Sequence, residues 1–434
     1  MALQLLHDTL RVCQRAADAR LATQAAWGLV APRLCGRTHI LATGKASVAM
    51  LEAALGRLPA EDVGDVLITC PPEHEDRGHA VARNLSGTVR IRACDHPLPT
   101  QRNVAAAEEV LQFVNALAQH DTLLVLLSGG ASAHLCLPMS GISLRELSSC
   151  TRALQRSGAT IRELNAVRKH VERLKGGGLA MACSAGTLVT AILSDVLPAS
   201  DGSPALDTIA SGPTVPDPTT FADALAVLRS RNVQDVPSIM AHLQRGANGE
   251  LPETPKSRDA LRAMTHEIIV GDNGVMLAAA SDFLQSRDVH VVSVRHRVEG
   301  EAADIARQML EEKRCIPQSD DRLRAMLVGG EWTVTANGST GTGGPSQELA
   351  LAALLEMQTD ESCALLAYSS DGLDGPTTAA GAIVTSDMLH TGPRETLEAA
   401  LANHDAHPAL ASLGALINTG PTGTNVNHIA ILVW

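Results

Sequence analysis

The stretch that decides the fold is residues 123–138, LLVLLSGGASAHLCLP, in which an unbroken apolar run stops at Ser128-Gly129-Gly130. Such a run is typical of a strand buried on both faces, as in a parallel sheet. Parallel sheets bind ligands at the carboxyl ends of their strands. The glycines let backbone N–H groups approach an anion, and Ser128 and Ser132 add hydroxyls. We therefore predict a ligand-binding turn. An ordinary tight turn stays open as the alternative, because the stretch is neither a Walker loop nor GxGxxG.

The composition favours a two-domain, soluble protein. The chain has 434 residues, which is too long for one compact core, so we expect two domains. Hydrophobic residues make up 45% of it and supply ample core material. Aromatic residues make up 2% and the net charge is −12, so we expect no nucleic-acid partner. The nine cysteines show no CxxC or zinc-type spacing, which favours reduced thiols in the cytoplasm. Residues 1–21 predict an amphipathic helix, and no apolar window is long enough for a membrane span.

A lysine follows the first apolar strand of the chain. Residues 39–50, HILATGKASVAM, predict a strand, a turn at Gly44-Lys45-Ala46 and then a helix. A lysine at a strand-to-helix turn is placed to meet an anion, because the helix N-terminus adds its own positive end. A solvated lysine is the alternative. Further strands are predicted at 63–69 and 89–92, and a helix at 103–118.

Residues 161–180, IRELNAVRKHVERLKGGGLA, predict a helix that ends at three glycines. At helical spacing Asn165, Arg168, Glu172 and Lys175 share one polar face. Such a face is either solvated or, with these amide and basic side chains before a glycine turn, an anion-binding surface.

Asp195 follows the next predicted strand, 187–193. A carboxylate there either holds a metal or orients a hydroxyl, or it caps the following turn; both interpretations stay open. Residues 209–220, IASGPTVPDPTT, predict an irregular loop, at the surface or shaped around a substrate. Residues 244–259 have no periodicity and are the best candidate for a domain linker, between domains at 1–243 and 260–434.

The second domain restarts the α/β alternation. We predict strands at 266–270 and 289–294, and helices to about residue 285 and at 302–312. Residues 326–357 then predict a strand, a Gly-Gly-Glu turn, a strand, a glycine-rich loop and a helix that Ser346 caps. This loop suits phosphate oxygens at a helix N-terminus. After a strand at 365–368, Asp371 and Asp374 on a glycine-rich turn are typical of a metal or general-base position. A last strand is predicted at 429–434.

Together these segments resemble the class II glycerate 2-kinases, whose C-terminal part is called the MOFRL domain. Ten pieces match in family order over nearly the whole chain. They are GKA from Gly44, DHPLP from Asp95, LSGGASA from Leu127, NAVRKHVERLKGGGLA from Asn165, LSDV from Leu193, IASGPTVPDPTT from Ile209, GGEWTVT from Gly329, GTGGPSQELAL from Gly341, DGLDGPTTAAGAIV from Asp371 and TGPTGTNVN from Thr419.

The resemblance implies an α/β fold with a Rossmann-like first domain, a mostly parallel sheet, a smaller α/β MOFRL-type domain and an active-site cleft between them. It implies transfer of the γ-phosphoryl group of ATP, with Mg²⁺, to the 2-hydroxyl of D-glycerate, giving 2-phosphoglycerate. Lys45 and Asp195 would be catalytic, and Asp195 and Asp371 would hold the metal. No oligomeric state is assigned. The residues expected to bind glycerate or nucleotide are Ser128, Gly129, Gly130, Ser132, Asn165, Arg168, Lys175, Gly341, Gly343, Gly344, Gln347, Glu348, Asp371, Asp374, Thr424 and Asn425.

The chain departs from the family pattern at two places. Where the family has GGRNQE, Pro345 replaces the expected active-site arginine and Ser346 the asparagine. Where the family ends in TGPTGTNVND, His428 replaces the aspartate. An arginine aimed at a transferring phosphoryl group contributes about 10³- to 10⁵-fold in rate, so we expect its loss to weaken catalysis.

Three hypotheses follow. The first is an active glycerate 2-kinase, because Lys45, Arg168, Lys169 and Lys175 supply cations and the aspartates supply carboxylates. The second is a catalytically weakened relative that binds a nucleotide or a hydroxy acid, as Pro345 and His428 suggest. The third is a hydroxypyruvate reductase, a name attached to relatives of the family. It ranks lowest, because no strand is followed by GxGxxG and an acidic residue about 20 positions on.

Overall fold

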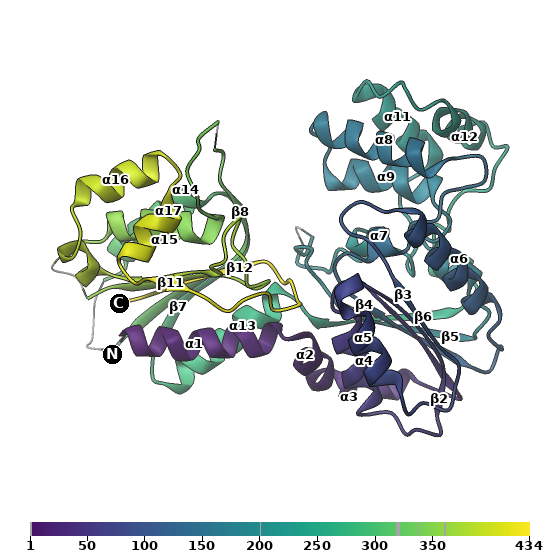
Figure 1. Cartoon of the computed structure of the whole chain (residues 1–434), viewed down its shortest axis with the longest axis horizontal. Coiled ribbons are helices and arrows are strands. Elements are labelled where there is room, and N and C mark those ends of the chain that lie inside the picture. Colours follow the sequence, from purple (N-terminus) through teal and green to yellow (C-terminus); the bar gives the residue numbers. More distant parts are fainter. Residues whose placement is uncertain (1, 200, 318–321, 337, 360–361) are drawn as a thin grey trace. The chain divides into compact units, whose positions relative to one another are not determined.

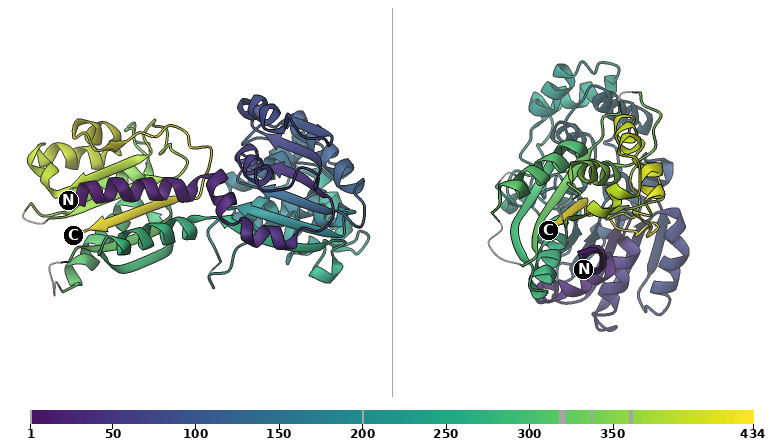
Figure 2. Two further views of the ribbon diagram at one scale, coloured as in Figure 1. Left: turned by 90° about the horizontal axis from the view of Figure 1, so that it is seen from below. Right: turned by 90° about the vertical axis from the view of Figure 1, so that its left-hand side faces the viewer.

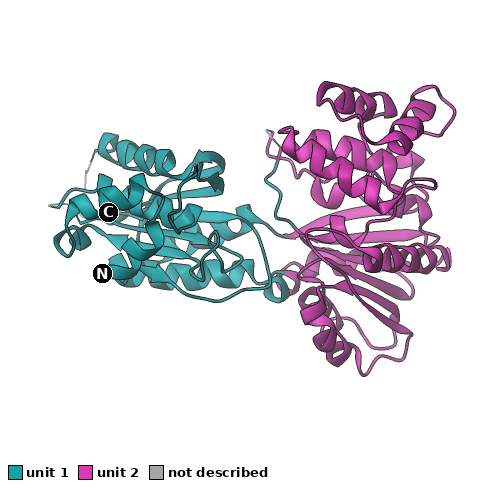
Figure 3. Ribbon diagram, turned by 45° about the horizontal axis from the view of Figure 1, so that its top comes forward, with its two compact units in different colours: residues 1–22, 194–198, 271–434 teal, residues 23–193, 199–270 magenta. Residues whose placement is uncertain are grey.

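The computed structural model describes residues 2–199, 201–317, 322–336, 338–359 and 362–434. Contacts divide the chain into two compact units (Figure 3). Unit 1 comprises residues 1–22, 194–198 and 271–434, and unit 2 comprises residues 23–193 and 199–270.

Unit 2 is built on a six-stranded sheet with the order β3-β2-β1-β4-β5-β6. The four pairings from β3 to β5 are parallel. β6 is parallel too, because Met264 N–H bonds the Gly186 carbonyl at one end and Ser194 N–H bonds the Gly271 carbonyl at the other. This is the strand order of the Rossmann fold, which confirms the predicted α/β class. The strands are β1 Thr38–Thr43, β2 Val63–Cys70, β3 Val89–Ala93, β4 Thr122–Leu127, β5 Thr187–Leu193 and β6 Met264–Gly271.

The strand β4 lies at the centre of this sheet, and all of its residues are buried. This explains the unbroken apolar run, since helices cover both faces. Right-handed crossovers put the helices that follow β1 and β2 on one face and α6, which links β3 to β4, on the other. The helices are α2 Ala19–Ala25, α3 Trp27–Val30, α4 Ser47–Leu55, α5 Glu75–Ala82, α6 Gln101–Asn115, α7 Ala131–His134, α8 Leu144–Arg156, α9 Ile161–Val171, α10 Gly178–Ala182, α11 Phe221–Ser230 and α12 Pro237–Ala247.

Four of these helices, α8, α9, α11 and α12, form a small bundle with a core of its own (Figure 1). Leu154, Val171, Phe221 and Leu243 are among the buried residues at its centre. The bundle carries α9, and with it Asn165, toward the loops of the sheet.

Unit 1 is built on a mixed six-stranded sheet with the order β11-β10-β9-β12-β8-β7. Only β7 and β8 pair in parallel; the other four pairings are antiparallel. The strands are β7 His290–Glu301, β8 Arg324–Thr333, β9 Ala364–Ser369, β10 Gly381–Thr385, β11 Leu416–Ile417 and β12 His428–Val433.

Helices cover both faces of this second sheet. The helices α1 and α13 pack together on one face, and α14 to α17 pack on the other, where α15 is buried at nearly every position (Figures 1 and 2). The helices are α1 Ala2–Ala17, α13 Asn273–Ser286, α14 Ala302–Cys315, α15 Pro345–Glu356, α16 Arg394–Ala402 and α17 Ala406–Ser412.

The two units differ from the predicted domains at both boundaries. The amphipathic helix α1 belongs to unit 1, because its apolar face packs on α13 and β9. The strand β6 belongs to unit 2, because it completes the first sheet beside β5. The segment 244–259, predicted as a linker, begins inside α12 and lies within unit 2. The predicted cleft between the domains stays a prediction.

Two predicted elements also have different limits. The helix expected over 161–180 ends at Val171, so Lys175 is no longer on its polar face. The Gly-Gly-Glu turn expected at 329–331 is not a turn, because β8 continues through it beside β7 and β12. Glycine is needed at position 329 within the strand, because a Cβ there would lie 2.1 Å from Asn273 Oδ1.

Candidate active site

The turns after β1 and β4 lie side by side at the carboxyl edge of the first sheet. The chain leaves these adjacent strands in opposite directions, toward β2 and toward β5, which makes this the point where Rossmann-type sheets bind ligands. Three successive N–H groups fasten the first turn to the second. Gly44 N–H bonds His134 Nδ1 at 3.2 Å, Lys45 N–H bonds the Gly129 carbonyl at 2.8 Å, and Ala46 N–H bonds Ser128 Oγ at 3.0 Å.

Lys45 leaves this turn with an exposed side chain. Its backbone is tightly held, because a Cβ on Gly44 would lie 2.4 Å from Ser128 Oγ and only glycine fits. No carboxylate oxygen of the described residues lies within 4 Å of the Lys45 ammonium. The structure thus brings Lys45, Ser128, Gly129 and Gly130 together around a cation that is open to a ligand.

The His134 side chain supports this turn from inside the protein. The ring is fully buried, and its Nδ1 lies 3.3 Å from the Thr69 carbonyl as well as near Gly44 N–H. That carbonyl already accepts the Ser47 hydroxyl, whereas Gly44 N–H has no other acceptor in the described chain. We therefore infer that Nδ1 accepts and that Nε2, which has no partner among the described residues, carries the proton. Burial lowers the pKa of His134 to about 4. The hydrogen bond that a protonated ring would donate to the Thr69 carbonyl opposes this shift, and the charges of His96 and Lys45 add to it.

A chain of hydrogen bonds continues the site along the edge. Ser132 Oγ lies 3.1 Å from Ser211 Oγ, which donates to Asn165 Oδ1 at 2.9 Å. The Asn165 amide in turn donates to the Thr208 carbonyl. Ala210 and Ser211 both adopt left-handed backbone conformations, with φ of 50° and 63°. Such residues cost about 1 kcal/mol or more each, so the loop is held in a shape that the chain does not favour alone.

Two of the predicted cations are used inside the protein. Lys175 is buried, with its ammonium on the Glu172 carboxylate and, at 2.8 Å, on the Ser132 carbonyl. Lys169 is equally buried between Asp207 and Asp217, at 3.2 Å from each. Both ammonium groups are neutralised by carboxylates, so they stabilise the loops around the site and leave no open charge for an anion. Arg168 is half-buried on α9.

In unit 1, the predicted phosphate cradle is already filled by a side chain. The Asp374 carboxylate accepts Ser346 N–H at 2.9 Å and Gln347 N–H at 2.7 Å, at the start of α15. Gly344 permits this approach, since a Cβ there would lie 2.4 Å from Asp374 Cγ. Asp374, and not Ser346, therefore caps the helix. Burial raises the pKa of Asp374 and the hydrogen bonds oppose this rise, so the group has a structural role.

Other predicted binding residues of this loop also have partners within unit 1. Gln347 Oε1 lies 2.8 Å from His407 Nδ1, and Glu348 Oε1 lies 2.8 Å from His404 Nδ1. Gly341 packs on the Asn403 carbonyl, and Gly343 packs on Ala406. The loop is thereby fastened to the segment between α16 and α17.

The carboxyl end of β9 presents Asp371, which is half-buried. Its Oδ1 accepts the Ser369 hydroxyl at 2.8 Å and Leu373 N–H at 3.1 Å. The loop before β12 packs against this end, with Ser370 Oγ bonded to Val426 N–H and near Asn425 Oδ1. Thr424 is buried, and its hydroxyl has no partner among the described residues.

Asp195 belongs to unit 1, near an acid on β8 that the motif analysis did not single out. Partial burial, then the charges of Asp195 and Glu299, raise the pKa of Glu331. His428, at the family aspartate position, pairs with Gly330 on one side and Ser369 on the other. Burial lowers its pKa to about 4 against the opposing charge of Asp371, so a neutral ring stands where the family has an acid. Within the described residues, no group of three or more His, Cys, Asp or Glu side chains gathers as a metal site.

The residues that motif reasoning missed are His96, His134, Ser211 and Glu331. Each lies in a quoted motif or beside one, but a single polar residue within an apolar or turn sequence carries no periodic signal. His134 in particular follows a strand within an apolar run, where a buried core histidine is the ordinary expectation. Only the fold places it against Gly44.

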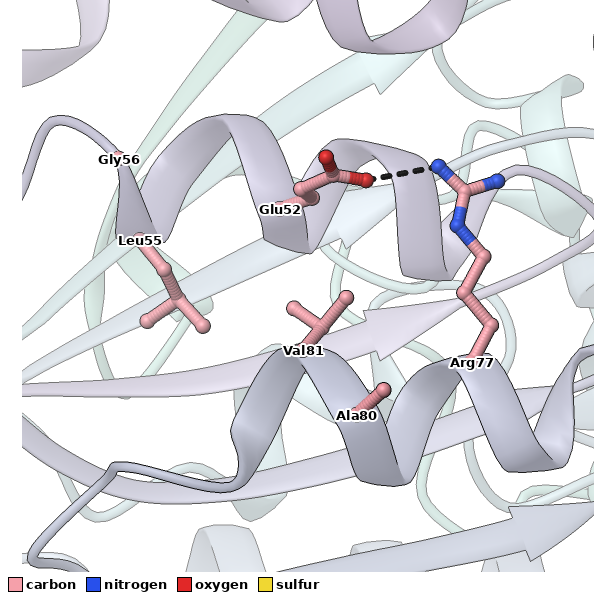
Figure 4. Close-up of a pocket in the computed structure, with 6 residues that line it drawn as sticks. All are labelled: Glu52, Leu55, Gly56, Arg77, Ala80 and Val81. Atoms are coloured by element: carbon pink, nitrogen blue, oxygen red, sulfur yellow. Dashed lines mark hydrogen bonds and ion pairs between the residues drawn. The ribbon is translucent and has the colours of Figure 1, made fainter.

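A pocket elsewhere in unit 2 does not compete with this site. It lies between the C-terminal half of α4 and the facing side of α5, and the Glu52–Arg77 ion pair of 2.7 Å joins the two helices there (Figure 4). Its charged groups are paired with each other, and Lys45 precedes the opposite end of α4. No helix among the described residues has the length and apolarity to cross a membrane.

Comparisons with known proteins show the family and agree with the fold. The family described as "Domain of unknown function (DUF4147)" matches residues 4–244, and the MOFRL family matches residues 324–428. The "Glycerate 2-kinase" of Pyrococcus horikoshii is 36% identical, covering 92% of this chain and 87% of that protein. The "D-glycerate 2-kinase" of Thermotoga maritima is 34% identical, covering 91% and 90%. A crystal structure of glycerate kinase from Thermotoga maritima superposes with a TM-score of 0.84 at 30% identity, covering 99% of this chain and 98% of that one.

Proposed function

The chain belongs to the MOFRL family of glycerate kinases, and on that basis we propose that it transfers the γ-phosphoryl group of ATP to the 2-hydroxyl of D-glycerate, giving 2-phosphoglycerate. The observation that carries this proposal is the Lys45 turn. It presents an exposed cation, without a carboxylate partner among the described residues, where a Rossmann-type sheet binds ligands.

In this proposal, Lys45 binds and orients the transferring phosphoryl group. Phosphoryl transfer depends on positioning and on charge stabilisation more than on covalent chemistry. A cation whose backbone is fixed by Gly129 and Ser128 is already in place when charge develops, so little reorganisation is needed. Ser132 and Asn165, linked through Ser211, offer hydroxyl and amide groups for the hydroxy acid.

We assign Asp195 and Asp371 to the metal and to the substrate hydroxyl. Mg²⁺ that enters with ATP would neutralise phosphate charge, and such ions are held by one or two carboxylates together with phosphate oxygens. The surroundings of Asp195 fit a cation, because burial raises the pKa of Glu331 and the nearby negative charges of Asp195 and Glu299 raise it further. Asp195 would also orient the substrate hydroxyl.

An enolase-coupled assay tests this function and its regiochemistry together. Enolase converts 2-phosphoglycerate directly to phosphoenolpyruvate, whereas 3-phosphoglycerate must first be isomerised by a mutase. We expect absorbance from phosphoenolpyruvate with ATP, Mg²⁺ and D-glycerate in the absence of mutase, and a rate lower by about 10²- to 10³-fold with Lys45→Ala. Signal only after mutase is added would show phosphorylation at the 3-hydroxyl. If the unmodified chain released ADP no faster than Lys45→Ala does, the result would contradict a kinase.

A second candidate, a weakened relative that binds ligand without turnover, rests on Pro345 and His428. Pro345 is the first residue of α15, a position that suits proline but supplies no charge. Calorimetric binding of ATP or glycerate without turnover would favour this candidate, and gain of turnover in Pro345→Arg would assign the defect to the missing arginine. The reductase hypothesis keeps the lowest rank, because the turn after β1 is TGKAS and not GxGxxG. Oxidation of NADH or NADPH by hydroxypyruvate would support it.

A further inference from the structure

The His96 ring lies beside Lys45, with Gly130 between them. A Cβ on Gly130 would lie 3.2 Å from His96 Cδ2, 3.2 Å from Lys45 Cγ and 3.7 Å from His96 Nε2. A side chain at position 130 would therefore stand between the imidazole and the lysine stem. Glycine leaves that space empty, at the carboxyl edge of β4.

Both polar ends at this gap are without a protein partner in the described chain. His96 is exposed and forms no hydrogen bond or ion pair with the described residues, and neither does the Lys45 ammonium. The nearest acid in the sequence, Asp95, is engaged elsewhere: its carboxylate accepts the Thr100 hydroxyl at 2.5 Å and lies 4.0 Å from Arg102. The Asp95 carboxylate therefore does not pair with the Lys45 ammonium.

The imidazole is in its neutral form at neutral pH. Partial burial, and then the charge of Lys45, lower the pKa of His96 to about 4. A neutral imidazole carries one N–H donor, so the ring can donate a hydrogen bond without adding a second charge. Behind it, the Nε2 of His134 is buried and without a partner in the described residues, and the charges of His96 and Lys45 help to keep the His134 ring neutral by lowering its pKa.

We propose that His96 and Lys45 form a two-donor clamp for one oxyanion over Gly130, so that His96 contacts the substrate directly. This rests on the proposed function, and it assigns to the gap either the carboxylate of the hydroxy acid or a phosphoryl group of the nucleotide. The two sources share the same chemistry: an oxygen that takes an ammonium on one side and a neutral N–H on the other. Gly130 keeps the gap open, because a Cβ there would lie 3.2 Å from both the His96 ring and the Lys45 stem.

Calorimetry of the full chain, with D-glycerate alone and with ATP alone, tests the clamp and identifies the source. His96→Leu removes the donor, and His96→Gln keeps an N–H. We expect His96→Leu to weaken one ligand about tenfold or more and the other by less than about threefold, with His96→Gln close to the unmodified chain. Gly130→Ala should weaken the same ligand as His96→Leu.

His79→Leu is the matched control, since it makes the same change at an exposed histidine on α5 of the same unit. Thermal unfolding identifies any variant whose loss comes from misfolding, and if Gly130→Ala is one of these, the His96 pair decides alone. Binding of both ligands by His96→Leu within about twofold of the unmodified chain would overturn the clamp.

A titration with inorganic phosphate separates this inference from the proposed function. The NMR signal of the His96 Cε1–H, assigned by its absence in His96→Gln, should shift saturably with phosphate and should no longer shift in Lys45→Ala. That result would support the clamp even in a chain that phosphorylates nothing. An unchanged signal over the full titration would overturn the clamp even if the kinase assay succeeds.

Discussion

Two glycine-rich turns look alike in this sequence and differ in the structure. The turn at 128–132, SGGAS, and the loop at 341–345, GTGGP, both stand between a strand and a helix and were both predicted to bind anions. In the first, the backbone holds Lys45 and leaves its ammonium open. In the second, Asp374 takes the N–H groups of α15 for itself. The difference shows that glycine content marks close approach, whereas the partner that approaches decides whether a ligand can enter.

The largest effect should come from removing the open cation. Lys45→Ala should lower kcat/KM for D-glycerate phosphorylation by about 10²- to 10³-fold, because a preorganised charge is lost where charge develops. The unfolding free energy should stay within about 0.5 kcal/mol, since the side chain is exposed.

Arg57→Ala is the control for Lys45→Ala, because Arg57 is exposed just past the C-terminal end of the same helix α4. It should leave kcat/KM unchanged. Equal activity in Lys45→Ala and Arg57→Ala would remove the contrast between the two turns.

The filled turn should respond in stability instead. Asp374→Ala should lower the unfolding free energy by about 2–3 kcal/mol, because it removes a helix cap and leaves the buried N–H groups of Ser346 and Gln347 without their carboxylate acceptor. Urea unfolding measures this loss. KM for ATP should change by less than about threefold in the folded fraction, since we assign no ligand to that helix end. A tenfold rise in KM for ATP with unchanged stability would support the prediction that this loop binds phosphate.

His134 provides a further test of the Lys45 turn, because its buried ring supports that turn from inside the protein. His134→Leu removes the acceptor for Gly44 N–H and should lower kcat about tenfold, while His134→Asn, which keeps an acceptor near Nδ1, should recover part of the activity. In a Lys45→Ala background the same change should cost almost nothing further, because His134 acts through Lys45. Additive losses would show a purely structural role. Faster hydrogen exchange at the Gly44 amide in His134→Leu provides a readout independent of activity.

The smallest effect concerns His428, the first residue of β12 in the interior of the second sheet. Its pKa of about 4 lies below the unfolded value, so the folded state binds the proton less tightly. The stability from this group is complete above about pH 6.5 and is lost as the pH falls toward 4. His428→Asn should therefore reduce the loss of unfolding free energy between pH 7 and pH 5 by about 1–2 kcal/mol. Identical pH dependence in both chains would place the ring in a more polar setting than burial indicates.

Much of the fold could be predicted because burial on both faces leaves a direct record in sequence. The runs that became β4 and β5 are fully buried, and their limits were predicted within a residue. The errors arose where polar or small residues concealed the continuation of an element. Gly329 and Gly330 suggested a turn inside β8, and the residues after Val171 continued a helical pattern that the backbone leaves.

The sequence by itself determined the α/β class, the family and the placement of Lys45 at a strand-to-helix turn, since apolar runs, glycines and ordered motifs are local or linear features. Only the tertiary structure decided which charges are open. Lys175 and Lys45 carry the same group, yet Lys175 is paired with Glu172 while Lys45 faces no carboxylate among the described residues. Asp371 and Asp374 stand three apart, yet one is half-buried at a strand end and the other caps α15. The charge state and the availability of a group depend on what lies within a few ångströms, and for these groups many of those neighbours are distant in the chain.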